Sequence, residues 1–187
     1  THFPALLPRE AAFAASGSSI IWLNNTLQII SGGGNKARIF QNINTDLTSW
    51  EITHNEIPAD TSSGFFTIAA KNKTHFWVAG GNYLKIDSSE IPIMESKDGG
   101  KNWTPIENPL PKNYYIEKVI WSNPYWIVTG PAGSYAFHPL LKKWVQLSES
   151  HFHNIIATRQ KIIGVGAKGQ IGYLLKKDLD KLFLPKE

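Results

Sequence analysis

The stretch Phe76-Trp-Val-Ala-Gly-Gly-Asn82 is a short apolar run that ends in glycine, and comparable runs recur along the chain. The runs that contain Gly32, Gly80, Gly130 and Gly166 are separated by 48, 50 and 36 residues. Spacings of about 40–50 residues are typical of proteins that are built from one repeated β unit. We therefore expect a repeat protein in which each of these runs is a strand of one unit.

A second landmark recurs in phase with the glycines, namely a tryptophan that opens a later strand at Trp50, Trp103 and Trp144. Between these landmarks, short β-branched and aromatic runs alternate with clusters of glycine, asparagine, proline and aspartate, as strands and turns do. The pattern predicts an all-β fold, a β-propeller with about four blades that forms a single domain over residues 1–187. The expected blades are residues 10–57, 62–110, 114–149 and 152–187.

The fourth unit lacks a fourth strand that begins with tryptophan, and its tail over residues 174–184 is expected to be a strand or a short turn. Propellers commonly close when an N-terminal strand completes the last blade, because closure removes exposed sheet edges. The segment Thr1–Arg9 contains two prolines and makes a poor strand, so we expect the closing strand and further blades upstream. The chain would then be the C-terminal part of a larger ring. The alternative is a self-contained four-bladed propeller whose last strand is Leu179–Leu184.

Composition excludes several classes of protein. Apolar residues make up 42% of the chain and charged residues 18%, which is typical of a globular domain and not of a disordered one. The net charge of +4 is spread along the chain without a basic run, so we expect no nucleic-acid partner. No apolar stretch is long enough to span a membrane. The chain has no cysteine, which excludes disulfides, thiolate zinc sites and cysteine nucleophiles.

Residues Ser96, Asp98, Gly100 and Trp103 match the Asp-box pattern S-x-D-x-G-x-x-W at every fixed position. In such a turn, Asp98 accepts hydrogen bonds from backbone N–H groups and Gly100 supplies a positive φ angle. Trp103 is expected to pack between adjacent sheets. These roles are structural, and they are favoured over a catalytic or calcium-binding role because the turn is expected at the edge opposite to the binding loops.

Together with further stretches, this box resembles the photosystem II stability/assembly factor-like group of BNR-repeat proteins, which are often labelled glycosyl hydrolase or oxidoreductase. The resembling stretches are Glu10–Gly17, Ala37–Phe40, Ala79–Tyr83, Ser96–Trp103 and Gly164–Gly169. The resemblance implies a bacterial, seven-bladed propeller of which these are the later blades, and a binding or assembly scaffold. Members of the group often look exported, which implies a periplasmic location. The chain departs from the pattern at Asn82, where aspartate is expected, and in the degenerate box before Trp50.

In a propeller, the loops between the second and third strands and the loops between blades share one face, and such loops carry function more often than strands do. The candidate binding residues on this face are Glu10, Arg38, Asn82, Tyr83, Lys85, Tyr114 and His151. The same side is expected to hold Arg9, Lys36, Lys112, Tyr115, His153 and Lys168. The face is basic and aromatic, which favours a protein or a small anionic ligand as the partner.

Two pairs on this face have alternative interpretations. Glu10 and Arg38 form either a functional pair at the central channel or a salt bridge between blades. His151 and His153 share one strand face, a spacing that metal sites use. No third ligand lies nearby in sequence, so we expect no metal, and no other cofactor is indicated.

Three functional classes follow from these observations. The favoured one is a non-enzymatic binding or assembly scaffold. The alternative is a sialidase-like glycoside hydrolase, which needs three arginines on a carboxylate, whereas this chain has only Arg9, Arg38 and Arg159. Arg159 is expected on the other face, so part of the catalytic machinery would have to lie in missing blades. An oxidoreductase has no support, because no dinucleotide-binding glycine motif or cysteine pair is present.

Overall fold

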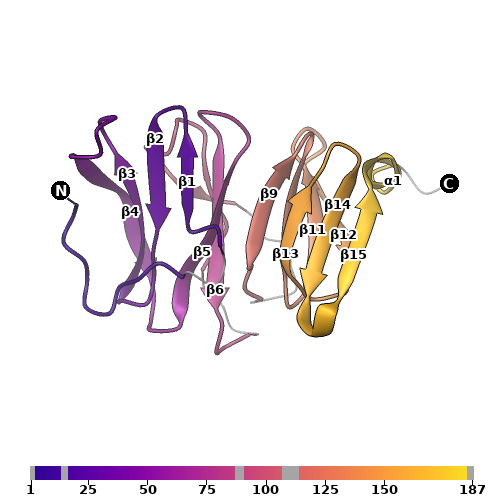
Figure 1. The fold of residues 1–187 in the computed structure, drawn as a ribbon, viewed down its shortest axis with the longest axis horizontal. Coiled ribbons are helices and arrows are strands. Elements are labelled where there is room, and N and C mark those ends of the chain that lie inside the picture. The colour runs from indigo at the N-terminus through magenta and orange to yellow at the C-terminus, as the bar shows by residue number, and fades with distance from the viewer. Residues whose placement is uncertain (1–2, 14–16, 87–90, 107–113, 185–187) are drawn as a thin grey trace.

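A computed structural model describes residues 3–13, 17–86, 91–106 and 114–184 of the 187-residue chain. Within these residues the protein is all-β, with four antiparallel sheets that follow one another along the chain (Figure 1). In each sheet the strands lie side by side in sequence order, so that hairpins connect neighbouring strands. No helix in the described part of the chain is long and apolar enough to cross a membrane.

The first and second sheets have four strands each. The first sheet contains β1 (Ile20–Leu23), β2 (Thr26–Ile30), β3 (Lys36–Asn42) and β4 (Trp50–Pro58). The second sheet contains β5 (Ser63–Ala70), β6 (Phe76–Asn82), β7 (Met94–Ser96) and β8 (Thr104–Pro105). The last two strands are short, and the turn between them holds the S-x-D-x-G-x-x-W motif.

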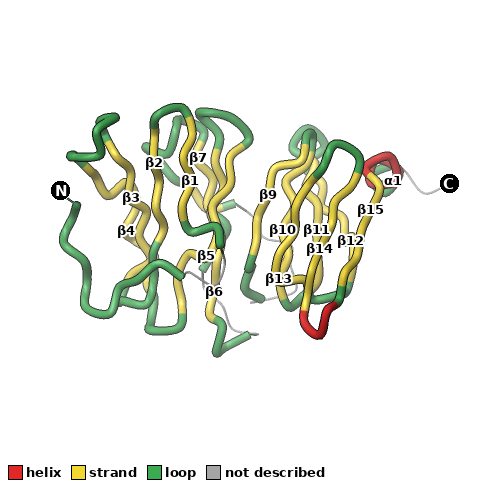
Figure 2. Tube along the Cα trace, in the orientation of Figure 1, coloured by secondary structure: helices red, strands yellow, loops and turns green. Residues whose placement is uncertain are grey.

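The third sheet has four strands and the fourth sheet has three. The third sheet contains β9 (Lys118–Ser122), β10 (Tyr125–Gly130), β11 (Gly133–His138) and β12 (Lys143–Ser148). The fourth sheet contains β13 (Phe152–Ala157), β14 (Lys161–Gly166) and β15 (Ile171–Leu175). Two short helices lie at opposite ends of β15, the 3₁₀ turn η2 (Ala167–Gly169) before it and α1 (Lys176–Lys181) after it (Figure 2).

The sheets span residues 20–58, 63–105, 118–148 and 152–175. The tail differs from the expectation, because β15 ends at Leu175 and α1 follows it. The alternative in which Leu179–Leu184 is a fourth strand is therefore wrong. The physical reason is the helical spacing of Leu179 and Phe183, which both pack into the apolar cluster next to the fourth sheet. The Tyr125 hydroxyl fixes the helix by donating a 2.5 Å hydrogen bond to Asp180.

Apolar side chains between consecutive sheets form three clusters, which we call the first, second and third clusters in chain order. Strand β6 is buried along its whole length because alternate residues serve different clusters. Phe76 and Val78 face the first cluster, and Trp77 and Ala79 face the second. Strand β10 follows the same rule, with Trp126 in the second cluster and Ile127 in the third. The middle sheets thus bury both of their faces.

The rings of Trp77 and Trp126 form the centre of the second cluster. They stack with centroids 4.6 Å apart and planes 4° from parallel, and both residues are fully buried. Phe137 and Trp144 add further ring contacts to Trp77. Large aromatic rings bury much apolar area each, so this group joins the second sheet to the third.

The S-x-D-x-G-x-x-W turn belongs to the second sheet and packs against the first sheet. Asp98 Oδ1 accepts hydrogen bonds from the backbone N–H groups of Lys101 and Asn102, at 3.1 and 3.0 Å. Gly100 has φ +91°, and its N–H donates to Ser96 Oγ at 2.9 Å. Trp103 lies in the first cluster and its Nε1–H reaches Thr53 Oγ1 on β4 at 3.2 Å.

The first strands of consecutive sheets lie next to one another, and Thr67 on β5 joins them. Its fully buried hydroxyl oxygen accepts hydrogen bonds from Ser18 Oγ at 2.9 Å and from the Val119 N–H at 3.0 Å. Ser18 precedes β1 and Val119 lies on β9, so this one hydroxyl touches segments from three sheets. The register of β5 shifts between Phe65 and Thr67, which is a bulge that redirects the side chain.

The outer faces of the first and fourth sheets carry exposed apolar side chains. Ile20 and Trp22 on β1 are both more than half exposed. On the fourth sheet, Ile156 pairs with Ile163, which pairs with Tyr173, so these side chains form one row across three strands. Contiguous apolar surface of this kind is typical of a face that another protein element covers.

The contribution of the buried Thr67 hydroxyl to stability can be tested. We expect Thr67→Val to lower the free energy of unfolding by about 1–3 kcal/mol, because the buried Val119 N–H loses its acceptor while the side-chain shape is kept. Thr104→Val on exposed β8 is the matched control and is expected to change stability by less than about 0.5 kcal/mol. Thermal unfolding followed by circular dichroism measures both, and equal midpoints for the two variants would contradict the role of Thr67.

A second stability prediction concerns two neighbouring glycines of the turn. Gly99 and Gly100 have φ +85° and +91°, but only a Cβ at Gly100 would collide with the buried amides of Gln28 and Gln41. We expect Gly99→Ala to cost about 1 kcal/mol from backbone strain alone, and Gly100→Ala about 2–4 kcal/mol from strain and overpacking together. Urea unfolding of the two variants gives the comparison. A Gly99→Ala variant that is as unstable as Gly100→Ala would argue against the packing of this turn on the first sheet.

Candidate functional site

One edge of the molecule gathers the ends of β2, β6 and β14 and the starts of β5, β9 and β13, and we call it the loop face (the lower edge in Figure 1). This arrangement follows from the antiparallel order of each sheet, because every second strand ends where every first strand begins. The turn between β7 and β8 lies at the opposite edge, since β7 runs antiparallel to β6. The loop face is therefore the edge at which the predicted binding loops meet.

A row of aromatic rings runs along the loop face. Tyr83 contacts Phe13 with ring centroids 6.1 Å apart, and Phe13 contacts Phe66 at 4.6 Å. Phe66 in turn contacts Tyr115 at 5.8 Å, and all three contacts are edge-to-face. The Tyr115 hydroxyl donates a 2.8 Å hydrogen bond to Glu117 Oε1. The row thus connects the loop after β6 with the residues in front of β9.

Asn82 anchors the loop that presents Tyr83. Its Oδ1 accepts hydrogen bonds from Ser62 Oγ and from the backbone N–H groups of Leu84 and Lys85, each at 3.0 Å. Its Nδ2 donates to both oxygens of Asp60, at 3.3 and 3.1 Å. Asn82 is itself buried, so it shapes the loop from below, while the side chains of Tyr83 and Leu84 are exposed.

Glu10 and Arg38 form a buried pair that fastens the N-terminal segment to the first sheet. Glu10 Oε1 accepts hydrogen bonds from Arg38 Nε at 2.7 Å and Ser31 Oγ at 2.5 Å, and Oε2 accepts from Arg38 Nη2 and from the Leu7 N–H. Burial acts to raise the pKa of Glu10, but the hydrogen bonds from Arg38, Ser31 and Leu7 outweigh it and hold the pKa below its ordinary value. Both side chains lie beneath the surface and are saturated with partners.

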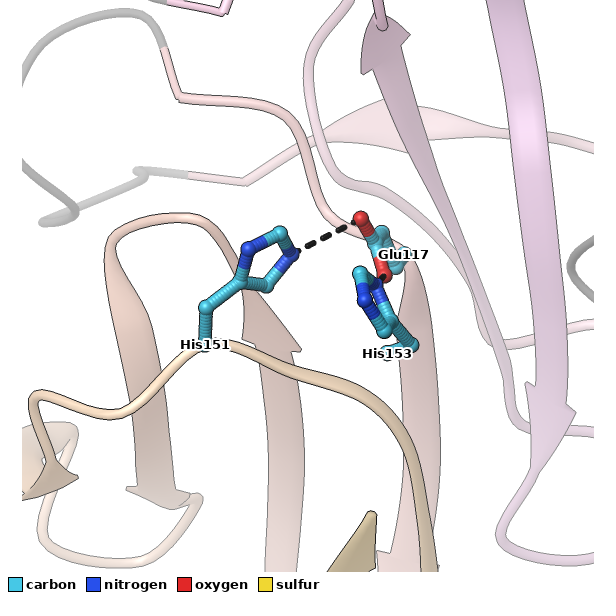
Figure 3. A group of neighbouring side chains, drawn as sticks. All are labelled: Glu117, His151 and His153. Carbon is cyan, nitrogen blue, oxygen red and sulfur yellow. Dashed lines mark hydrogen bonds and ion pairs between the residues drawn. The ribbon is translucent and has the colours of Figure 1, made fainter. Parts of the chain in front are cut away.

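Three further side chains meet at the loop face between the third and fourth sheets (Figure 3). Glu117 Oε1 lies 2.9 Å from His151 Nε2, and Glu117 Oε2 lies 2.8 Å from His153 Nδ1. The two imidazole rings are 4.5 Å apart, centroid to centroid. The carboxylate therefore lies between two imidazoles that come from the next sheet.

The backbone positions these three residues through Thr129 on β10. The Thr129 carbonyl accepts a 2.9 Å hydrogen bond from the Glu117 N–H, and its buried hydroxyl donates a 3.1 Å hydrogen bond to the Phe152 carbonyl. Phe152 separates the two histidines in sequence. The register of β13 shifts between Phe152 and Asn154, so His153 occupies a bulge, a feature that often redirects a side chain toward a site.

The remaining predicted residues of this face differ in exposure. Lys85 is exposed, with its Nζ 3.8 Å from Asp60 Oδ2, and Tyr114 is half-buried. Burial and the hydrogen bond to Glu117 raise the pKa of the Tyr115 phenol. Lys112 lies outside the described residues. The structure thus brings Tyr83, Asn82 and Lys85 together in one loop and His151 near Tyr115. Glu10 and Arg38 are instead buried between the N-terminal segment and the first sheet.

Sequence reasoning missed Glu117, which is 34 residues from His151 and becomes its neighbour only because the third and fourth sheets pack together. It also missed a groove of about 770 Å³ between the second and third sheets. Its lining includes His75, Trp77, Glu95, Lys97, Lys143 and Trp144. Of the regularly spaced tryptophans, Trp144 lines this groove, and no sequence signal joined it to His75.

Glu95 is an acid of this groove whose pKa is strongly lowered. It accepts hydrogen bonds from His75 Nε2 at 2.7 Å and Trp77 Nε1 at 3.1 Å, and Lys97 Nζ lies 2.7 Å from Oε2. Burial acts to raise the pKa of Glu95, but these three partners together lower it to about 2. The carboxylate is therefore a charged anchor that holds the start of β6 against β7.

The arginines do not form the carboxylate clamp of a sialidase in the described part of the chain. Arg38 is paired with Glu10, and Arg159 lies in the hairpin between β13 and β14, at the edge opposite to the loop face. Comparison with protein-family models gave no match for the chain, and comparison with curated proteins gave none either.

The perturbed carboxylate predicts a pH dependence. Because the pKa of Glu95 is about 2 in the folded state, against an ordinary value of 4.5, its stabilising effect is complete above pH 4.5 and is lost as the pH falls toward 2. We expect Glu95→Gln to lower the free energy of unfolding at neutral pH by on the order of 2–3 kcal/mol, with the difference from wild type shrinking between pH 4.5 and 2. Thermal unfolding at a series of pH values tests this, and Glu51→Gln on the exposed part of β4 is the control. A pH-independent difference would contradict the low pKa.

Proposed function

We propose that this chain forms four consecutive blades of a β-propeller that acts as a non-enzymatic binding scaffold, with the loop face as its binding surface. The recurring glycine and tryptophan spacings support the blades, as do the sequence-ordered sheets and the adjacent first strands. The exposed apolar faces of the first and fourth sheets are surfaces that further blades of a larger ring would cover. The contacts of Ser96, Asp98, Gly100 and Trp103 support an Asp-box turn.

The observation that carries the binding function is the aromatic row on the loop face. Tyr83 and Leu84 are 46% and 72% exposed, yet the loop that holds them is fixed by the buried Asn82 network. Exposed aromatic and apolar side chains on a rigid loop are the residues that contribute most at protein interfaces, because little entropy is lost when they bind. Lys85 adds a positive charge beside them. This combination favours a protein partner or an anionic ligand.

A scaffold explains the described residues better than a hydrolase does. A glycosidase needs two carboxyl groups that flank an open site. On the loop face, Glu10 is buried under Arg38 and Glu117 is occupied by Tyr115 and two histidines. Glu10 and Glu117 thus hold protein groups in place. Two further acids of this face are exposed: Asp60, which is held by Ser62 and Asn82, and Glu149, in the loop before β13.

A pair of matched leucines tests the proposal. Leu84 lies on the loop face, whereas Leu140 lies in the turn between β11 and β12 at the opposite edge and is 88% exposed. We expect a photo-reactive phenylalanine analogue at position 83 to crosslink one recurring partner from the native host. Leu84→Ser should reduce that crosslink at least about tenfold, because the contact loses an exposed apolar anchor. Leu140→Ser should leave the yield unchanged.

Folding is controlled by requiring equal thermal midpoints for Leu84→Ser and Leu140→Ser, since both leucines are on the surface. Crosslinking that is equally sensitive to the two substitutions, or that occurs equally from a probe at Leu140, would contradict a binding surface on the loop face. A crosslinked species that carries a chemically altered substrate would contradict the non-enzymatic role.

A further inference from the structure

We propose that Glu117, His151 and His153 form a binding site for a divalent transition-metal ion of the zinc type. One ligand atom from each of these side chains lies within 4.8 Å of the others, with two imidazole nitrogens and one carboxylate oxygen available (Figure 3). The inference does not depend on the number of blades or on the identity of a partner, since the site is built within the third and fourth sheets alone.

The distances between these atoms are close to those of a bound ion. The ligand atoms of a tetrahedral zinc ion lie about 3.4 Å apart, given metal–ligand bonds of about 2.1 Å. The two nitrogen-to-oxygen distances here are 2.9 and 2.8 Å, and the largest separation in the group is below 4.8 Å. Rotations that move each atom by on the order of 1 Å would therefore place an ion between the three groups.

The donor atoms suit zinc in chemical type. Imidazole nitrogen and carboxylate oxygen are both common zinc ligands, and two histidines with one acid leave a fourth position for water or another group. His151 Nε2 and His153 Nδ1 already face the carboxylate. To bind the ion, a neutral imidazole needs only to carry its proton on the other ring nitrogen. The carboxylate offsets part of the charge of the ion.

The surrounding residues hold the acid in position, as the outer shell of a metal site does. Tyr115 donates a 2.8 Å hydrogen bond to Glu117 Oε1, and its ring packs against the buried Phe66. Thr129 connects the backbones of Glu117 and Phe152. Partners that orient ligands in this way raise metal affinity, and their loss typically costs about 10–100-fold.

Exposure distinguishes this site from the pair that His75 forms with Glu95. The side chains of His151 and His153 are 37% and 48% exposed, so an ion from solvent can reach them, while Glu117 is 15% exposed and stays fixed. In the groove, Glu95 serves a single histidine, His75, together with Trp77 and Lys97. The lysine supplies there the positive charge that a metal ion would otherwise provide. His75 is therefore a matched control for metal binding.

Isothermal titration of the metal-free protein with zinc chloride tests the site. We expect one equivalent of zinc per chain for the wild type, and an affinity at least about tenfold lower for His153→Gln and for Glu117→Gln. His75→Gln should keep the wild-type stoichiometry and affinity. Tyr115→Phe, which removes only the hydroxyl that orients Glu117, should weaken binding by about tenfold with no change in stoichiometry.

Visible absorption of bound cobalt(II) is a second measurement of metal binding that does not rely on calorimetry. The chain has no cysteine, so the visible absorption of bound cobalt reports nitrogen and oxygen ligands only. We expect a tetrahedral cobalt spectrum for wild type and His75→Gln, and its loss in His153→Gln, which replaces a side chain that is 48% exposed. The proposal is overturned if the wild type takes up no stoichiometric zinc. It is equally overturned if His153→Gln and Glu117→Gln bind zinc as the wild type does.

Discussion

A single buried hydroxyl, that of Thr67, joins the first three sheets. It accepts hydrogen bonds from a segment before β1 and from β9, so three sheets meet at one side chain on β5. Buried polar groups need partners, and this requirement fixes the offset between neighbouring sheets more tightly than apolar contact alone can. Because the first strands are held in line, their starting ends form one edge, and that edge is the loop face.

Apolar packing supplies the rest of the organisation. Strands β6 and β10 direct alternate side chains to different clusters, so the two middle sheets are covered on both faces. The parallel stack of Trp77 and Trp126 fills the space between them. The same geometry leaves the outer faces of the first and fourth sheets with exposed apolar side chains, which agrees with the proposal that these sheets belong to a larger ring.

The all-β class and the positions of most strands were predictable because the signals were local and repeated. Glycines at the ends of second strands and tryptophans at the starts of later ones located most strands of the four sheets, and the turn contacts of Asp98 follow from a short motif. The helix after β15 was missed because six residues with one buried side chain, that of Leu179, give a weak periodic signal. The burial of Glu10 and Arg38 could not be predicted, since it depends on where the N-terminal segment lies.

The candidate metal site was missed for a different reason. His151 and His153 are two residues apart in sequence, but Glu117 joins them only after two sheets have packed through Thr129. No pattern within one strand reports a contact that spans two repeats. A site of this kind can be recognised only when the order of the sheets is known, because its polar side chains come from the starts of first strands in neighbouring sheets. The composition of a single sheet does not reveal it.

The division of the core into three clusters has a consequence for how this chain can change. Each cluster joins two consecutive sheets, so the free energy of folding is distributed over separate contacts and not concentrated in one core. Substitutions in different clusters, such as those around Trp103 and those around Phe152, share no contacts and should combine additively. Such a protein can therefore acquire a new chemical group at one inter-sheet boundary, as Glu117 and the two histidines illustrate, while the turns and aromatic stacks at the other boundaries drift independently.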